Sequence, residues 1–255
     1  MKSFKSILPV LSVITLFGSF VSCEIEEVEP GYELISDYTL NYTNSIGVPL
    51  ANPVGIASDD ENFWIMFGEH NAEEHQLIYY NPETYEIERS FVFVDLIEEL
   101  GTGVYGITWS GEHVWISVSG NTNKVVKVDP FTGKILQSWS SPTVLGPSDL
   151  AFDRGMLWLS SGTGDLYAIN PTNGGSELFT EHKHDSHRDL GMLVYADKMW
   201  VGDLFDKDIH VYDLDSKEYL GVIKTALYAN GKFCLYQGQF VVLDEGGIKF
   251  YDIVV

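Results

Sequence analysis

The sequence predicts an all-β protein, a five-bladed β-propeller, from a five-fold repeat, from β-rich runs separated by turn residues, and from the repeat length. Each repeat opens with a residue that precedes a large apolar residue, and nine positions later comes Trp in four repeats and Val in the fifth. The opening residues are Gly55, Gly106, Asp149, Gly191 and Lys232, and the later ones are Trp64, Trp115, Trp158, Trp200 and Val241. Successive openings lie 51, 43, 42 and 41 residues apart, so the length variation falls in loops, as in stacked repeats.

The second repeat, residues 106–139, has the pattern of one blade. Its four short runs of β-forming residues are separated by polar turns at 110–112, 121–123 and 129–133. The last turn contains a Pro, which fixes φ for a turn, and a Gly, which accepts positive φ. Four strands in about 35 residues are typical of a propeller blade.

Residues 1–22 are predicted to be a lipoprotein signal peptide. Two lysines form a basic start, and the apolar run at 7–20 is too short to span a membrane. The next residues, Phe-Val-Ser-Cys, resemble a bacterial lipobox, in which Cys23 becomes the lipidated first residue of the mature chain. Several acyl chains on one residue would give stable anchoring. The alternative is an ordinary signal peptide cut near Ser22.

Residues 23–31 form an acidic tether that ends in Pro-Gly, and its carboxylates repel one another and stay solvated. The run is also similar to the export signals of surface lipoproteins, with a plain spacer as the alternative. Loss of residues 1–22 removes two lysines and no acid, which changes the formal net charge from −22 to −24. This charge argues against nucleic acid as a partner. We therefore predict a chain anchored by lipid at the bacterial outer membrane, either periplasmic or surface-exposed.

Residues 32–255 are predicted to form one propeller that is closed by the N-terminal strand. Residues 32–42 alternate apolar and polar side chains, which indicates a strand without a sheet of its own. The fifth repeat has the complementary defect, because only three strands fit before the chain ends at Val255. We therefore expect the N-terminal strand to complete the last blade, which protects its edge.

Two charged residues interrupt the opening position of the repeats. Glycine at that position allows backbones to crowd around a narrow axis. Asp149 and Lys232 must instead point into the channel or pair, because an unpaired buried charge is costly. We predict that they meet at the channel mouth, as a structural ion pair or as the polar floor of a ligand site.

Polar insertions are expected to gather on the rim above that floor. The first repeat carries one with Glu69 and His70, and another, with His187 and Asp189, separates the third and fourth repeats. In a propeller these two loops lie on the same rim, where ligands commonly bind. The four residues are therefore candidate ligand-binding residues.

The sequence lacks the common motifs of metal, nucleotide and hydrolase sites. It has no His-Glu-x-x-His, no calcium loop, no phosphate-binding loop and no nucleophile elbow. The histidines at 182, 184 and 187 stand beside Lys183 and Arg188, which repel a cation. We therefore predict no metal site and no cofactor; the alternative is calcium held by carboxylates from separate blades.

The repeat motifs resemble the quinoprotein-like and glutamine-cyclotransferase-like propellers of bacteria. The resemblance rests on runs such as Gly-Ile-Thr-Trp and Lys-Val-Asp-Pro-Phe-Thr-Gly-Lys, and it spans the blades. Where plant-type glutaminyl cyclases have a pattern like Gly-Glu-Gly-Trp-Gly-Leu-Thr, residues 102–108 read Thr-Gly-Val-Tyr-Gly-Ile-Thr, without the acid. Where they have Asn-Glu-Leu-Glu, residues 148–151 read Ser-Asp-Leu-Ala and keep one acid.

We interpret the chain as a membrane-tethered, exported propeller lipoprotein that acts as a binding or scaffold module for a protein or a glycan. The alternative is an enzyme of the glutamine-cyclotransferase or lactonase type with its site at the channel mouth. No catalytic residue is assigned. A convergent acid with a perturbed pKa at that mouth would distinguish the two interpretations.

Overall fold

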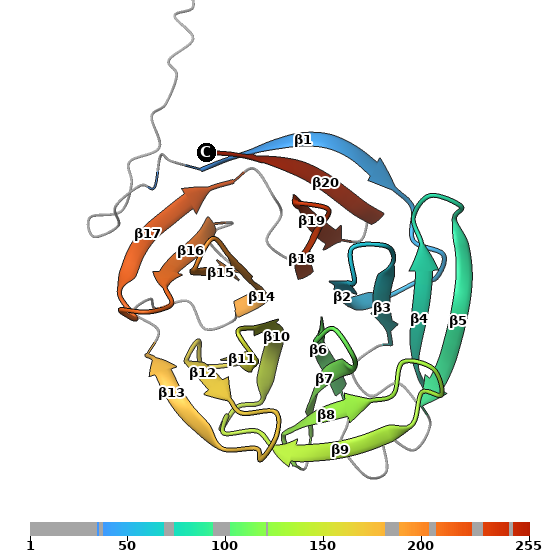
Figure 1. Cartoon of the computed structure of the whole chain (residues 1–255), viewed down its shortest axis with the longest axis horizontal. Helices are drawn as coiled ribbons and strands as arrows, with labels where there is room; N and C mark the ends of the chain where they lie inside the picture. The colour runs from blue at the N-terminus through green and yellow to red at the C-terminus, as the bar shows by residue number, and fades with distance from the viewer. Residues whose placement is uncertain are drawn as a thin grey trace, which may run out of the picture. The chain divides into compact units, whose positions relative to one another are not determined.

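The computed structural model describes residues 35, 38–68, 74–93, 103–120, 122–181, 189–203, 208–225, 232–244 and 247–255, without the side chains of 189, 190 and 203. These residues belong to one compact unit, Glu33–Val255. Five four-stranded antiparallel sheets stand around a common axis, each with one strand at the centre and one at the periphery (Figure 1). The predicted all-β, five-bladed propeller is therefore confirmed.

The strands follow one another from the centre outwards in the first four blades. Blade one contains β2 (Pro53–Ser58), β3 (Phe63–Phe67), β4 (His75–Asn81) and β5 (Glu86–Phe93). Blade two contains β6 (Gly103–Trp109), β7 (Val114–Ser119), β8 (Lys124–Val128) and β9 (Ile135–Ser140). Blade three contains β10 (Pro147–Asp153), β11 (Met156–Ser161), β12 (Leu166–Ile169) and β13 (Ser176–Thr180). Blade four contains β14 (Asp189–Tyr195), β15 (Lys198–Asp203), β16 (Asp208–Asp213) and β17 (Tyr219–Lys224).

Blade five joins the two ends of the described chain. It contains β18 (Lys232–Tyr236), β19 (Gln239–Asp244) and β20 (Gly247–Val254), followed at the periphery by β1 (Thr39–Ile46). β1 pairs antiparallel with β20 from Thr39 opposite Val254 to Ile46 opposite Ile248. The predicted closure of the last blade by the N-terminal strand is therefore confirmed, as Figure 1 shows.

The bounds of the closing strand differ from the prediction of 32–42. β1 begins at Thr39 and continues to Ile46, with an irregularity in the register between Tyr42 and Asn44. Upstream of the strand, the Ile35 amide donates a hydrogen bond to the Val222 carbonyl on β17, at 2.9 Å. Most side chains of β1 are exposed, so their polarity says little about where the strand begins and ends. Its pairing with β20 sets these bounds.

The outer hairpins of the first four blades share one turn. In blade two the Asp129 carboxylate accepts the amides of Phe131 and Thr132, at 2.9 and 2.7 Å, and Gly133 has φ 68°. The same arrangement, an Asn or Asp followed four positions later by a residue with positive φ, recurs in the other three: Asn81 and Tyr85, Asn170 and Gly174, Asp213 and Lys217. A side chain that caps its own turn therefore sets the register of each hairpin.

The tryptophans of the repeat pack between blades, as their position predicts. All four lie on the second strand of a blade and are at most 8 % exposed. Trp64 stacks on Trp109 of the next blade, with ring centroids 5.9 Å apart. The buried apolar residues that the structure describes form five clusters, and each cluster joins two adjacent blades. The stability of the ring therefore rests on the interfaces between blades.

Candidate functional site

The first strands of the five blades surround the axis and bring their backbones unusually close together. A Cβ atom added at Gly106 would lie 2.5 Å from the Cα atom of Asp149 on the neighbouring strand. One added at Gly191 would lie 2.3 Å from Cε1 of Phe233. Glycine at positions 106 and 191 therefore avoids a clash with the neighbouring blade, as the repeat pattern suggests.

Asp149 and Lys232 come together at this narrow level. Their side chains lie on blades three and five, and Lys232 Nζ is 3.8 Å from Asp149 Oδ1. Lys232 also donates a hydrogen bond to the Ser148 carbonyl at 2.7 Å. The two residues are only 3 % and 9 % exposed. They form a buried ion pair between two blades that are not neighbours.

Backbone amides of three blades surround the Asp149 carboxylate, and one of them binds it. The Met192 amide of blade four donates to Oδ2 at 2.8 Å. The amides of Ile107 in blade two and Leu150 in blade three lie close enough to lower the pKa of this carboxyl. The Asp149 amide itself donates to Ser160 Oγ at 3.1 Å. The Met192 amide and Lys232 therefore connect the Asp149 side chain of blade three to blades four and five.

Burial and charge act in opposite directions on Asp149. Desolvation raises the pKa of its carboxyl to about 6. The charge of Lys232, and to a smaller extent the backbone amides of Leu150, Met192 and Ile107, act to lower this pKa. The group is therefore ionised at neutral pH, where its negative charge matches the ammonium of Lys232. A carboxylate held in this way suits a structural ion pair better than proton transfer to a substrate.

The described residues do not test whether the four candidate ligand-binding residues of the rim lie close together. Glu69, His70 and His187 lie outside them, as does the anchor candidate Cys23. Asp189 is the first residue of β14 and its backbone pairs with Asp203, but its side chain is outside the described part. Their grouping above Asp149 and Lys232 stays a prediction.

Metal ligands do not cluster in the part of the chain that the structure describes. No group of three or more His, Cys, Asp or Glu side chains there could hold an ion. The predicted alternative, calcium bound by carboxylates from separate loops, stays a prediction, because several of these loops lie outside the described ranges.

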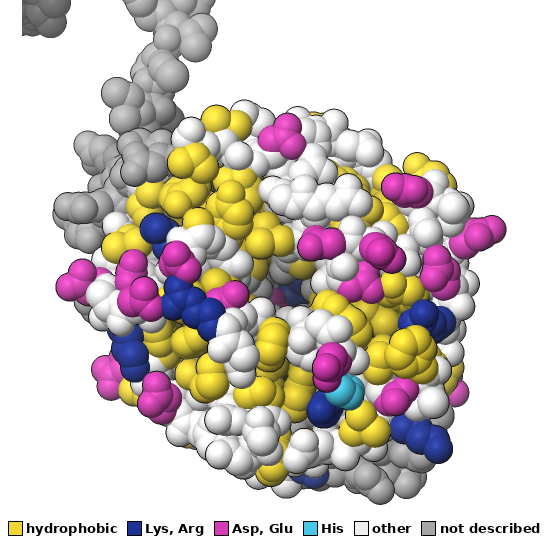
Figure 2. Space-filling view, viewed as in Figure 1, with side chains coloured by type: hydrophobic (Ala, Val, Ile, Leu, Met, Phe, Trp, Pro, Cys, Tyr) yellow, Lys and Arg dark blue, Asp and Glu magenta, His cyan; other side chains and the backbone are white. Residues whose placement is uncertain are grey.

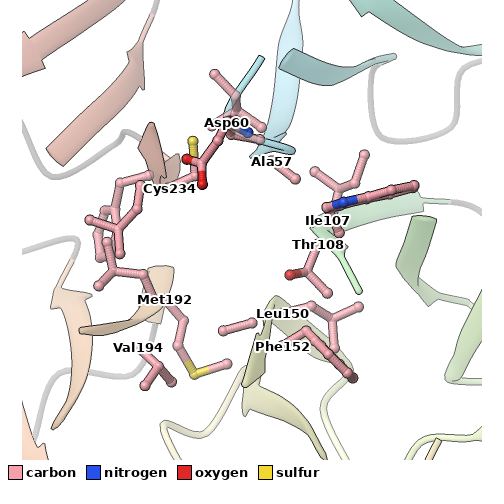
Figure 3. A pocket seen from close by; sticks show the side chains of 16 residues that line it. Ala57, Asp60, Ile107, Thr108, Leu150, Phe152, Met192, Val194 and Cys234 are labelled. Atoms are coloured by element: carbon pink, nitrogen blue, oxygen red, sulfur yellow. The ribbon is translucent and has the colours of Figure 1, made fainter. Parts of the chain in front are cut away.

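Sequence reasoning missed a cavity of about 190 Å³ between the inner strands. Three consecutive residues of each inner strand line it, and they directly follow the five opening positions of the repeat. Figure 2 shows the centre of the ring hollowed, with hydrophobic side chains and uncharged polar or backbone atoms around the opening. Figure 3 shows the lining side chains arranged around a central open space. The cavity could have been suspected from the small side chains of Ala57, Thr108, Ala151 and Cys234, which share one position of the repeat and leave space at the axis.

Comparison with known proteins identifies the fold and not the activity. No family model matches the chain, and no curated protein matches it. The crystal structure of glutaminyl cyclase from Myxococcus xanthus superimposes with a TM-score of 0.64 and 12 % sequence identity, over 85 % of this chain and 97 % of that one. This similarity agrees with the resemblance to glutamine-cyclotransferase-like propellers, and at this identity it shows the fold alone.

Proposed function

We propose that this protein is an exported, lipid-anchored propeller that binds a ligand without transforming it. The observation that supports this proposal is the state of Asp149, the acid that its run shares with the cyclase-like pattern. Asp149 is 3 % exposed, and its carboxylate accepts a hydrogen bond from the Met192 amide and lies 3.8 Å from Lys232 Nζ. A general acid or base must reach the proton that it transfers, and Asp149 has no such freedom.

The run at 102–108 supports the same proposal. The cyclase-like pattern has an acid there, and this sequence has neither Asp nor Glu in those seven positions. The second candidate is an enzyme of the cyclotransferase or lactonase type. It is favoured by the similarity in fold to glutaminyl cyclase and by the raised pKa of Asp149, about 6, because catalytic acids often have perturbed pKa values.

Ammonia release from a glutaminyl peptide distinguishes the binding function from cyclotransferase activity, the part of the second candidate that the similarity in fold favours. We expect the purified protein to release ammonia no faster than buffer. Release above that background would overturn the binding proposal in favour of the enzyme, and its loss in an Asp149→Asn variant that is still folded, with release kept in the surface variant Glu177→Gln, would assign it to Asp149. Glu177 suits the control because its side chain is 70 % exposed.

The membrane part of the proposal rests on the N-terminal sequence. Residues 1–31 carry the signal peptide, the lipobox-like run and the acidic tether, and they lie outside the described residues. Among the residues that the structure does describe, no helix is long and apolar enough to cross a membrane. A lipid on Cys23 would give the chain its membrane partner, and its strong negative charge favours a protein or a glycan over nucleic acid as ligand.

Substitution of the anchor cysteine is expected to release the protein from membranes. Cys23→Ala should abolish metabolic labelling with a fatty acid and move the protein to the soluble fraction, because the acyl chains supply the membrane affinity. The matched control is Cys234→Ala, which removes the other cysteine of the chain and should leave labelling intact. Labelling that persists in Cys23→Ala would show that the anchor lies elsewhere.

A further inference from the structure

Apolar side chains stay partly exposed along the outer edge of the interface between blades four and five. Among the described residues, seven such side chains pack against the buried cluster that these blades share, whereas each of the other four clusters has two or three. Figure 2 shows hydrophobic side chains gathered over this part of the ring, in the upper left of the view. Four of the seven and the two residues that follow them in β20 and at its end form what we call the apolar strip: Tyr38, Leu40, Leu220, Ile253, Val254 and Val255.

The apolar strip lies at the end of the ring that is opposite to the buried ion pair. β18 begins with Lys232, which is level with the start of β20, and β20 then runs to Val254 at the other end of the blade. β1 begins beside it, with Thr39 opposite Val254. A surface that covers the strip therefore leaves the end with Asp149 and Lys232 free for a ligand.

The chain that leads from the predicted anchor joins the ring at this strip. The Ile35 amide donates a hydrogen bond to the Val222 carbonyl on β17 at 2.9 Å, and the ring of Tyr38 packs edge-on against Trp200, with centroids 5.1 Å apart. Cys23 precedes Ile35 by twelve residues, a length of chain that spans at most about 40 Å when fully extended. A lipid on Cys23 would therefore keep the strip within reach of a bilayer, at a high effective concentration.

The peripheral strands at the strip carry no acidic side chain. Neither β1 nor β17 contains Asp or Glu, whereas β5 exposes Glu86 and Glu88. Asp252 of β20 has a partner, because its carboxylate accepts a hydrogen bond from Gln239 at 2.8 Å. β9 also lacks acids and exposes Leu136, but it lies in blade two, across the ring from β1 and β17 (Figure 1). A bilayer that meets the strip therefore has few ions to desolvate.

We infer that the apolar strip contacts the interfacial region of the lipid bilayer, so that the propeller is held with blades four and five towards the membrane. This inference rests on the proposed lipid anchor and adds to it a contact made by the protein itself. The acyl chains supply the affinity, and the strip supplies the orientation. A tyrosine such as Tyr38 suits this region, because its ring is apolar and its hydroxyl can stay in water.

Quenching of a fluorophore by labelled lipid tests this contact. The label on Val255→Cys reports from the strip and the label on Leu136→Cys reports from blade two, since these side chains are 84 % and 50 % exposed and Cys234 is buried. The lipidated full chain is reconstituted into phosphatidylcholine vesicles with nitroxide groups near the headgroup ends of the acyl chains. We expect position 255 to lose roughly half of its emission, because interfacial apolar surfaces enter the bilayer by about 5–10 Å. Position 136 should lose almost none.

A charge placed in the strip should weaken the contact. Val254→Glu and its matched control Leu136→Glu replace side chains of nearly equal exposure, 48 % and 50 %, so both variants should melt with the wild type. Val254→Glu should reduce the quenching at position 255 by about 2-fold or more, because a charge resists transfer into the bilayer. Leu136→Glu should leave that quenching unchanged. All values are normalised to vesicles without nitroxide.

Four results would overturn the inference. These are no quenching at position 255, quenching at position 136 that equals or exceeds it, equal effects of the two Glu variants, and self-quenching between labelled chains without quenching by lipid. The last result would show that a second copy covers the strip. Flotation of the chain with the vesicles tests the anchor separately. A chain that floats without quenching at position 255 retains the proposed anchor and loses the strip contact, whereas a chain that does not float loses both.

Discussion

Deletion of β1, residues 39–46, should expose one edge of the last blade, cause association and lower the melting temperature by about 10 °C. β1 pairs with β20 over its whole length and supplies Ile46 and Leu40 to the two apolar clusters that blade five shares with its neighbours. Its loss should cost at least about 3 kcal/mol, in the range for lost core packing. For a domain of this size, 1 kcal/mol corresponds to about 2–4 °C in melting temperature.

Thermal unfolding and size-exclusion chromatography check this expectation. Removal of residues 24–31 from the acidic tether is the matched control, since it shortens the chain by the same eight residues and leaves all five blades complete. That control should melt with the wild type. A β1 deletion that remains monomeric with an unchanged melting temperature would contradict the role of β1 in closing the ring.

The repeat pattern predicted the architecture because it reports on interactions that recur in every blade. Trp64 and its equivalents mark the interfaces between blades, and Asp129 and its equivalents mark the turns of the outer hairpins. Both are local or evenly spaced features, so a single sequence reveals them. The break of the glycine pattern at Asp149 and Lys232 likewise indicated where two charges meet, and they do meet at 3.8 Å.

Other features of the structure are hard to recognise from the types of side chain in the sequence. The donor that binds the Asp149 carboxylate from blade four is the backbone amide of Met192, which any residue could supply. The bounds of β1 depend on its pairing with β20, because its side chains are mostly exposed. The cavity between the inner strands arises from the spacing of five strands around the axis, and its one sequence signal is the set of small side chains at Ala57, Thr108, Ala151 and Cys234.

The central claim is that Asp149 is a structural residue of the ring and is not free to act on a substrate. Asp149→Asn leaves Lys232 buried without its counterion, and Lys232→Met leaves the carboxylate buried without its own. Each single substitution should lower the free energy of unfolding by about 3–5 kcal/mol, as expected for a broken buried pair. Asp149→Asn/Lys232→Met leaves neither charge unpaired and should recover part of that loss.

The most direct test is the coupling free energy of this double-mutant cycle, measured by denaturant unfolding at neutral pH. The exposed pair of Glu177 and Lys217, 3.5 Å apart, is the matched control, and Glu177→Gln with Lys217→Met should show almost no coupling. We predict a coupling of about 1–3 kcal/mol between Asp149 and Lys232. Additive losses in the double variant, or an Asp149→Asn variant as stable as wild type, would contradict the structural role and leave the carboxylate available for catalysis.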